Sequence, residues 1–433
     1  MATSVQRWWH KLVWPWSPLS EREASEAIVR NLWLHWFPAK VSGRSMSWSY
    51  SLWLGTVAAS LFVILTVTGV MLMFFYVPST ERAYGSIKDL QYAVSFGRIL
   101  RNQHRWAAEG MVALVFIHMA RVFFTGAYRG ARVLNWLVGV ALLLLTLMLS
   151  FTGYLLPWDQ LAYWAITVGT NIASEAPVLG PTFKYLLLGG HFVGQQTLLR
   201  FYVLHVFFLP AVVWILFAYH MWRVRKDGGL AAIEPLRAMR RAEPKEMPRS
   251  KSYSLFGLTP GTSVAVMSSM GLEERDQVAS SPNLTRRMIL VFLVVFNITL
   301  LLSLLVNAPL EGPANPSVTP NPAKAPWYFV WLQELVASTT VHLGKVTISG
   351  GLVGGILVPG VLLAALILWP FFDRSTVSAE GVWFARERTR QNVVFAVITV
   401  AIIILIIVGM YLRGPYWRLY WPWSPRPVLP RVL

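Results

Sequence analysis

Four of the eight histidines in this 433-residue sequence form two matched pairs. His104 and His118 are 14 residues apart, and His205 and His220 are 15 residues apart. In an α-helix these intervals return a side chain to within about 40° and about 60° of its first direction, about 21–22 Å along the axis. We expect the two helices to face each other in an antiparallel arrangement, with His104 meeting His205 and His118 meeting His220. Facing imidazoles can hold the iron of a planar haem, so the pattern predicts two non-covalent b-type haems with bis-histidine ligation.

The histidine spacing has a second interpretation, in which the imidazoles only form hydrogen bonds between helices. A single buried histidine fits that interpretation as well as it fits iron ligation. Four histidines at matched intervals in two helices of opposite direction favour ligation. Ionisable side chains inside a membrane are costly and mark functional sites, which strengthens that preference.

Glycines repeat the histidine interval in two other apolar segments. Gly55 and Gly69 are 14 residues apart, and so are Gly139 and Gly153. Because glycine lacks a Cβ atom, it allows a haem edge to approach a helix closely at two depths. The alternative is that these glycines reflect only the high frequency of glycine in membrane helices.

Four arginines lie next to the predicted ligands along the chain. Carboxylate groups such as haem propionates are held by guanidinium partners. Contact with lipid headgroups is the alternative role for each of them. The propionate candidates are Arg101, Arg105 and Arg200 near the first predicted haem, and Arg121 near the second.

The composition shows what kind of protein must position these residues. Apolar residues make up 55% of the chain and charged residues only 13%, whereas soluble domains carry about 25% charged residues. This excludes soluble, fibrous and disordered classes and predicts an integral membrane protein. The net charge of +18 is then attributed to contact with membrane lipid, and no nucleic acid partner is expected. Because the chain has no cysteine, disulfides, thiolate metal sites and thioether-linked haem on this chain are excluded.

Uncharged runs of about 20 or more residues predict six membrane-spanning helices, and an apolar run that includes Glu109 and Arg121 predicts a seventh. The expected fold is an all-α integral membrane protein, in which a four-helix di-haem bundle is followed by a three-helix unit. The predicted spans are 45–80, 106–128, 133–158, 201–222, 288–310, 346–372 and 391–412.

Five regions follow from these spans. The four-helix di-haem domain covers 45–222, and the three-helix domain with a long loop covers 288–412. Before, between and after them lie an N-terminal interfacial segment (1–44), a basic linker (223–287) and a C-terminal tail (413–433). The N-terminal side of the membrane holds 25 Lys and Arg residues, Arg121 included, and the other side 13. This places the N-terminus and the linker in the cytoplasm, on the negative side, and the C-terminus on the positive side of the cell inner membrane.

Three segments of the four-helix region resemble the cytochrome b/b6 family of quinol–cytochrome c and plastoquinol oxidoreductases. They read QHRWAAEGMVALVFIHMARVFFTGAYRGARVLNW, TGYLLPWDQLAYWA and TLLRFYVLH. Further on, PANPSVTP and APWYFVWLQEL resemble the segment that holds the family's Pro-Glu-Trp-Tyr quinol motif. The resemblance covers about residues 30–412. The seven predicted helices and the histidine spacing resemble plastid-type cytochrome b6 joined to subunit IV in one chain.

The resemblance implies a quinol-oxidising site on the positive side, between the segment 159–200 and the loop 311–345. One electron would pass to a Rieske iron–sulfur partner and a c-type cytochrome, and the other through the haems to a negative-side quinone, with proton translocation. The family also implies a homodimeric complex. Interfacial anchoring is the alternative role for the aromatic pocket candidates. The quinol-pocket candidates are Pro157, Trp158, Asp159, Trp327 and Tyr328.

The quinol motif departs from the family pattern at its acidic position. Pro326 stands where the family has glutamate and Ala325 where it has proline. The family assigns that glutamate to quinol binding and proton removal, so another acceptor is needed. Glu175 and Glu334 are the proton-acceptor candidates, and an ordinary interfacial charge is the alternative for each.

Two other functions compete with quinol oxidation. The first is a di-haem electron conduit of a specialised respiratory complex that does not send the two quinol electrons along separate routes, which the missing glutamate favours. The second is a non-redox transporter or scaffold, which the paired histidines disfavour. A reduced-minus-oxidised spectrum with haem and iron–sulfur stoichiometry discriminates among the three.

Overall fold

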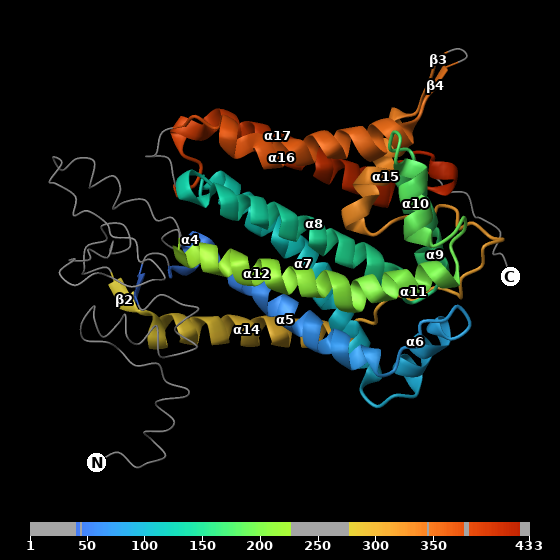
Figure 1. The fold of residues 1–433 in the computed structure, drawn as a ribbon, viewed down its shortest axis with the longest axis horizontal. Coiled ribbons are helices and arrows are strands. Elements are labelled where there is room, and N and C mark those ends of the chain that lie inside the picture. The colour runs from blue at the N-terminus through green and yellow to red at the C-terminus, as the bar shows by residue number, and fades with distance from the viewer. Residues whose placement is uncertain (1–39, 44–45, 227–276, 344–345, 376–380, 425–433) are drawn as a thin grey trace, which may run out of the picture.

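The computed structural model describes residues 40–43, 46–226, 277–343, 346–375 and 381–424 (Figure 1). The predicted interfacial segment and basic linker lie almost wholly outside the described residues. The described residues form long helices and two short antiparallel strand pairs, one between distant segments and one between neighbouring segments. Strand β1 (Lys40–Ser42) pairs antiparallel with β2 (Gln277–Ala279), and β3 (Val341–Leu343) pairs antiparallel with β4 (Val346–Ile348).

Among the described residues, seven helices are long and apolar enough to cross a membrane, which confirms the predicted number and order. Several contain π-helical or 3₁₀ turns within one continuous rod. In chain order the spanning helices are α5 (Leu54–Met73), α7 (Gly97–Phe124), η1 with α8 (Gly130–Arg132 and Val133–Leu155), α11 with η2 and α12 (Gln195–Val203, Leu204–Phe208 and Leu209–Lys226), α14 (Ser280–Leu305), η5 with α16 (Gly351–Leu357 and Val358–Phe372), and η7 with α17 and η8 (Arg386–Arg388, Thr389–Ile407 and Val408–Leu412).

Short helices lie before and between the spanning helices. Four of them, α6, α9, α10 and α15, lie toward one end of the helical stack, which we call the loop end (Figure 1). The short helices are α4 (Trp48–Ser51), α6 (Ala83–Tyr92), α9 (Gln160–Ser174), α10 (Gly180–Leu188), α15 (Trp327–Thr339) and η9 (Pro415–Trp417).

The second spanning helix is longer than the sequence predicts, because α7 begins at Gly97 rather than at residue 106. The added turns contain Arg101, which is buried. Its guanidinium donates to the Ala308 and Pro309 carbonyls at 3.0 and 2.7 Å. Hydrogen bonding to these loop carbonyls lets a charged residue remain inside the helix, where a hydropathy rule would end the span.

The last three spanning helices do not pack as one compact unit. Helix α14 packs against α5 and α7 at one edge of the structure, and α16 packs against α8 near the opposite edge, beside α17 (Figure 1). The core between α5, α7 and α14 contains Leu61, Ile64, Ala107, Val291 and Val295. The connection from α14 to α16 must therefore cross the loop end of the four-helix bundle, and this crossing carries α15 with it.

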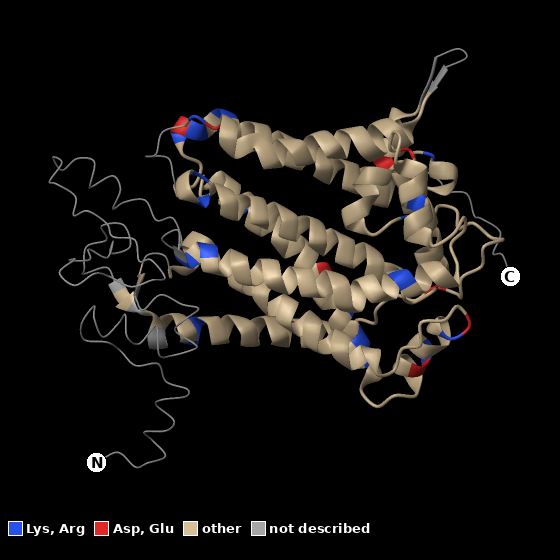
Figure 2. Cartoon of the chain, viewed as in Figure 1, with Lys and Arg blue, Asp and Glu red and all other residues tan. Residues whose placement is uncertain are grey.

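Charged residues lie mainly toward the two ends of the helices (Figure 2). At the end opposite the loop end, Arg388 is fully buried. It donates to the Phe123 carbonyl and the Tyr128 hydroxyl, both at 2.8 Å, and its Nε atom lies 3.5 Å from the Asp373 carboxylate. This buried cluster ties α7 to the end of α16 and the start of α17.

Candidate functional site

His104 and His205, which we call the first pair, meet in the half of the bundle nearer the loop end. Their ring centroids are 6.2 Å apart and the ring planes are inclined by 76°. With metal–nitrogen bonds of about 2 Å and ring half-widths of about 1 Å, an ion held axially between two imidazoles sets their centroids about 6 Å apart. The spacing of the first pair therefore fits a metal held between the rings, as in bis-histidine haem.

Hydrogen bonds fix the tautomer of both imidazoles in the first pair. His104 Nδ1 lies 2.9 Å from Thr68 Oγ1, and that hydroxyl donates its own proton to Ile64 O at 2.7 Å. His205 Nδ1 lies 3.0 Å from the Leu149 carbonyl. Since these oxygens can only accept from Nδ1, each Nδ1 carries the proton and each Nε2 keeps its lone pair. Unprotonated Nε2 atoms are what iron ligation requires.

A π-helical stretch explains why the second histidine interval is one residue longer than the first. His205 lies within η2, Leu204–Phe208, which has the wider i→i+5 hydrogen-bond pattern. A π-turn inserts one extra residue, so an interval of 15 in this helix corresponds in direction to an interval of 14 in a regular α-helix. From the spacing alone, the His205 and His220 side chains would point about 60° apart around the helix axis. The π-turn reduces this angle.

His118 and His220, which we call the second pair, lie on the same two helices further from the loop end. Their imidazoles are close enough to interact electrostatically. Because the earlier histidines meet each other and the later ones meet each other, α7 and the helix formed by α11, η2 and α12 run parallel. The expected antiparallel arrangement is therefore wrong, although the expected pairing is found. Neither Nδ1 atom of the second pair has a hydrogen-bond partner of normal geometry among the described residues, although the Asn135 backbone lies near His220. The second pair thus brings two buried imidazoles together with fewer hydrogen bonds to orient them.

Each of the four glycines contacts one histidine ring. A Cβ atom placed on Gly69 would lie 3.2 Å from His104 Cε1, and one on Gly153 would lie 2.4 Å from His205 Cε1. For the second pair the corresponding distances are 3.4 Å from Gly55 to His118 and 3.8 Å from Gly139 to His220. The glycines therefore make room for the imidazoles themselves, in addition to any haem edge.

The propionate candidates differ in what they contact. The Arg121 guanidinium lies over the Tyr50 ring at 5.0 Å, and its Nε and Nη2 atoms are buried without a hydrogen-bond partner in the described residues. Arg101 is occupied by loop carbonyls, and Arg200 donates to the Leu186 carbonyl at an exposed position. Arg105 forms an ion pair with a carboxylate on its own helix, described below. Of the four candidates, Arg121 leaves two buried donor atoms without a partner among the described residues, and Arg105 leaves one, its Nε atom.

The segment after α8 and the loop before α15 are joined by hydrogen bonds. Asp159 caps α9 through Ala162 N at 2.8 Å and also accepts from Glu311 N at 3.1 Å. The Trp158 carbonyl accepts from Ala314 N at 3.1 Å. Burial raises the pKa of Asp159, although its two backbone donors act in the opposite direction. The two segments expected to form the quinol pocket are thus adjacent, with Pro157, Trp158 and Asp159 at their junction.

Trp327 and Tyr328 open α15 and lie against α7. Trp327 Nε1 donates to Glu109 Oε2 at 2.8 Å, and Glu109 Oε1 is 2.7 Å from Arg105 Nη2. Tyr328 is 6% exposed, and burial raises its pKa to about 12. Sequence reasoning did not include Glu109 in the site. Its position inside a predicted spanning segment could have indicated this role, because carboxylates are rare in such segments and are mostly functional there.

The two proton-acceptor candidates are not in contact with this cluster in the described residues. Glu334 is buried and paired with Arg413, with N–O distances of 2.5–3.1 Å, and it also accepts from Trp417 Nε1 at 3.0 Å. Glu175 is exposed at the end of α9, where its Cγ atom faces Gly351. The Glu334 carboxylate therefore anchors the chain after α17, and Glu175 lies at the surface beside η5.

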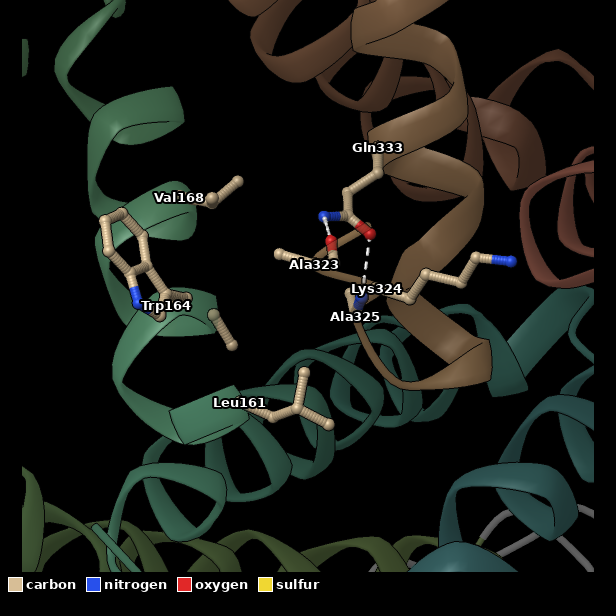
Figure 3. Close-up of a pocket in the computed structure, with 8 residues that line it drawn as sticks. Leu161, Trp164, Val168, Ala323, Lys324, Ala325 and Gln333 are labelled. Atoms are coloured by element: carbon tan, nitrogen blue, oxygen red, sulfur yellow. Dashed lines mark hydrogen bonds between the residues drawn. The ribbon is translucent and has the colours of Figure 1, made fainter. Parts of the chain in front are cut away.

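A cleft separates α9 from the chain just before α15 (Figure 3). Leu161, Trp164 and Val168 form the α9 wall. On the opposite wall, Gln333 accepts from Ala325 N at 2.7 Å and donates to Ala323 O at 3.0 Å, which holds the loop in place. The empty space in this cleft, which is open to solvent, is about 180 Å³.

Comparison with known proteins agrees with this architecture. The family described as cytochrome b/b6/petB matches residues 40–228, and the family described as cytochrome b (C-terminal)/b6/petD matches residues 313–420. Cytochrome b6 of Heliomicrobium gestii is 45% identical over 175 residues, which are 40% of this chain and 82% of that protein. The menaquinol:cytochrome c reductase cytochrome b subunit of Bacillus subtilis (strain 168) is 47% identical over 168 residues, 38% of this chain and 75% of that protein.

A solved structure has the same fold over most of the chain. A chain of a hyperthermophilic respiratory Complex III superposes with a TM-score of 0.64 and 26% identity, covering 83% of this chain and 84% of that chain. The matches to the two halves of the family together span both the histidine-bearing helices and the α15 loop. Family membership implies b-type haem and quinone binding. With its seven apolar helices, this multi-pass membrane chain belongs to the cytochrome b/b6 family and is a cytochrome b subunit of the quinol–cytochrome c reductase type.

Proposed function

We propose that this chain is the di-haem, quinol-oxidising subunit of a proton-translocating Rieske/cytochrome b complex. A quinol is oxidised on the positive side of the membrane, where it releases its protons. One electron leaves through a Rieske iron–sulfur protein and a c-type cytochrome, and the other crosses to a quinone near the negative side. The relatives named for menaquinol:cytochrome c reductase support quinol as the class of substrate.

The observation that carries this proposal is the geometry of the first pair. His104 and His205 are the ligands of one haem, and His118 and His220 are the ligands of the other. The 6.2 Å centroid spacing and the two protonated Nδ1 atoms support this assignment for the first pair. Arg121, with its unused buried donors, is suited to a propionate at the second pair. When bound, the two b-type haems supply one-electron redox chemistry that amino-acid side chains lack.

The protein's own residues shape the quinol site at the loop end. The Pro157-Trp158-Asp159 turn and the Trp327-Tyr328 pair approach it from two segments that hydrogen bonds hold together. Asp159 fixes the start of α9, which forms one wall of the cleft. Buried aromatic side chains on both segments exclude water, so a proton leaving the quinol must go to a side chain at the site.

The proposed orientation places the N-terminus in the cytoplasm and the C-terminus on the positive side. It rests on the excess of Lys and Arg in the segments on the N-terminal side of the membrane. The loop end, with the first pair and the quinol site, then faces the positive side. By analogy with the family, we include a homodimeric complex in the proposal.

The test is purification of the complex with its partners, followed by spectroscopy. We expect two b-type haems per chain, a Rieske iron–sulfur signal, and quinol-dependent reduction of the c-type cytochrome. Loss of the iron–sulfur signal together with full haem content would contradict the proposal.

The proline at position 326 favours one alternative function. In this alternative the chain is a di-haem conduit that does not send the two quinol electrons along separate routes. The quinol motif lacks its acidic residue, because Pro326 takes that position as the N-cap of α15. A conduit predicts two haems that equilibrate with each other in a complex without a Rieske partner. The stoichiometry measurement above therefore decides between the two functions.

A further inference from the structure

Glu109 occupies an unusual position for a carboxylate. It lies within the spanning helix α7, and its side chain is 17% exposed. A carboxylate at such a position is costly unless other groups compensate its charge. Two groups do so here, since Arg105 lies 2.7 Å from one carboxylate oxygen and the Trp327 indole donates to the other at 2.8 Å.

The contact with Trp327 places the carboxylate at the quinol motif. Trp327 and Tyr328 are the two motif positions that match the family, and they follow Pro326 directly. Tyr328 interacts electrostatically with both Glu109 and Arg105. The acidic group absent from the loop is thus present next to the loop, on the helix that carries His104.

We propose that Glu109 supplies, from α7, the carboxylate that the α15 loop lacks, and that it accepts a proton from the bound quinol. The inference rests on the proposed function. In this step one quinol O–H bond breaks and a Glu109 O–H bond forms. The second quinol O–H bond also breaks, and its proton is released to the positive side. One electron leaves to the iron–sulfur partner and the other to the haem of the first pair, so the quinol becomes a quinone. The proton on Glu109 then leaves toward the positive side.

The geometry of the carboxylate leaves room for this role. A carboxylate offers about four lone-pair positions, and the two described contacts use one on each oxygen. A quinol hydroxyl can therefore bind before either contact breaks. Protonation removes the negative charge and weakens the ion pair with Arg105, so the side chain becomes free to turn.

The ionisable groups around Glu109 come from three helices. Arg105 is on the same helix, Tyr328 is on α15, and Tyr154 is on α8, where its ring lies 5.3 Å from the Arg105 guanidinium. Of these, Arg105 makes the direct ion pair with the Glu109 carboxylate, at 2.7 Å. Glu334 and Glu175 do not compete for the role, because the first is saturated by Arg413 and Trp417 and the second contacts η5.

The test compares Glu109→Gln with a matched carboxylate-to-amide change at Glu81, an exposed residue of the same end. Both are assayed as the purified complex for quinol-dependent cytochrome c reduction from pH 5.5 to 9, per spectroscopically counted haem. We expect E109Q to lose about 10²–10⁴-fold in rate, with unchanged haem content and with the acidic limb of the pH profile removed. E81Q should match the wild type. A wild-type rate and pH profile in E109Q would overturn the proposal.

Relocating the carboxylate gives a second, independent measurement. In the E109Q background, Pro326→Glu returns an acid to the family position, and we expect recovery of at least about tenfold in rate. Absence of recovery, with haem content intact, would contradict the idea that Glu109 replaces the motif glutamate. If the wild-type complex itself, with both haems present, fails to oxidise quinol, the proposed function fails rather than the assignment of Glu109.

Discussion

The two histidine pairs use the same ligand type on the same two helices, yet their surroundings differ. In the first pair, both Nδ1 atoms are hydrogen-bonded and the glycines approach the rings to 3.2 and 2.4 Å as measured from an added Cβ. In the second pair, neither Nδ1 atom has a hydrogen-bond partner of normal geometry in the described part of the chain, and the corresponding Cβ distances are 3.4 and 3.8 Å. Matching ligands therefore do not imply matching sites.

The origin of the difference is one residue on each of two helices. Thr68 and Thr152 directly precede the glycines of the first pair, whereas Leu54 and Val138 precede those of the second. A threonine hydroxyl one residue before the glycine faces Nδ1 of the same imidazole. Hydrogen bonds to Nδ1 make an imidazole a stronger donor to its metal, so the two haems should differ in potential and in ease of loss.

The largest expected effect comes from removing the ligands. Replacement of His118 or His220 by Ala should remove the second haem and still allow a single turnover of quinol oxidation. Replacement of His104 or His205 should remove the first haem and stop the reaction. Haem content and low-temperature difference spectra check this, and two intact bis-histidine signals in any single variant would show that the ligand assignment is wrong.

The glycine distances predict a graded effect of adding one methyl group. In Gly153→Ala the new Cβ would lie 2.4 Å from His205 Cε1, and the overpacking should cost about 1–3 kcal/mol. We therefore expect haem at the first pair to bind about 10–100-fold more weakly. Gly139→Ala, with 3.8 Å available, is the matched control and should keep its haem. Equal haem retention in both variants would contradict the close contact at Gly153.

The threonines predict a smaller effect, seen in potential rather than occupancy. In Thr68→Val, His104 loses its hydrogen bond of about 0.5–1.5 kcal/mol, which corresponds to a rise of about 20–60 mV in the potential of the first haem. Thr152→Val should shift it less, because His205 also donates to the Leu149 carbonyl. Redox titration of the two haems checks this. A shift in the potential of the second haem instead of the first would show that the two pairs have been assigned the wrong way round.

The smallest predicted effect concerns pH at the end near the second pair. Burial raises the pKa of Asp373, but hydrogen bonds from Ser375 and Tyr128 and the charge of Arg388 outweigh burial and hold the pKa at about 2. A depressed carboxylate pKa stabilises the fold above the unfolded value of about 3.9, and this contribution is lost as the pH falls toward 2. Thermal release of haem should therefore become easier between pH 4 and 2 in the wild type, and Asp373→Asn should flatten that dependence. If haem release in Asp373→Asn depended on pH as steeply as in the wild type, Asp373 would not be the cause of the pH dependence.

The relative placement of the four histidines and four glycines could be predicted from the sequence, because these residues repeat at helical intervals. The four histidines and four glycines are paired one to one in the structure, because residues on a straight helix keep their direction and depth along the axis. The one-residue mismatch between the intervals could not be explained in advance. It depends on a π-turn at His205, and no residue type in Leu204–Phe208 predicts a π-turn.

Hydropathy, histidine spacing and family motifs determined the fold class, the number and order of spanning helices, and the family. These are properties of single segments, which the membrane forces into helices because backbone groups must be satisfied internally. Tertiary structure decided which carboxylate meets the quinol motif. Glu109 and Trp327 are 218 residues apart, and they meet only because α14 and α16 pack on opposite edges of the bundle and draw the α15 loop across its end. Such a contact cannot be predicted from the residues next to either partner in the sequence, because it forms only when distant segments pack together.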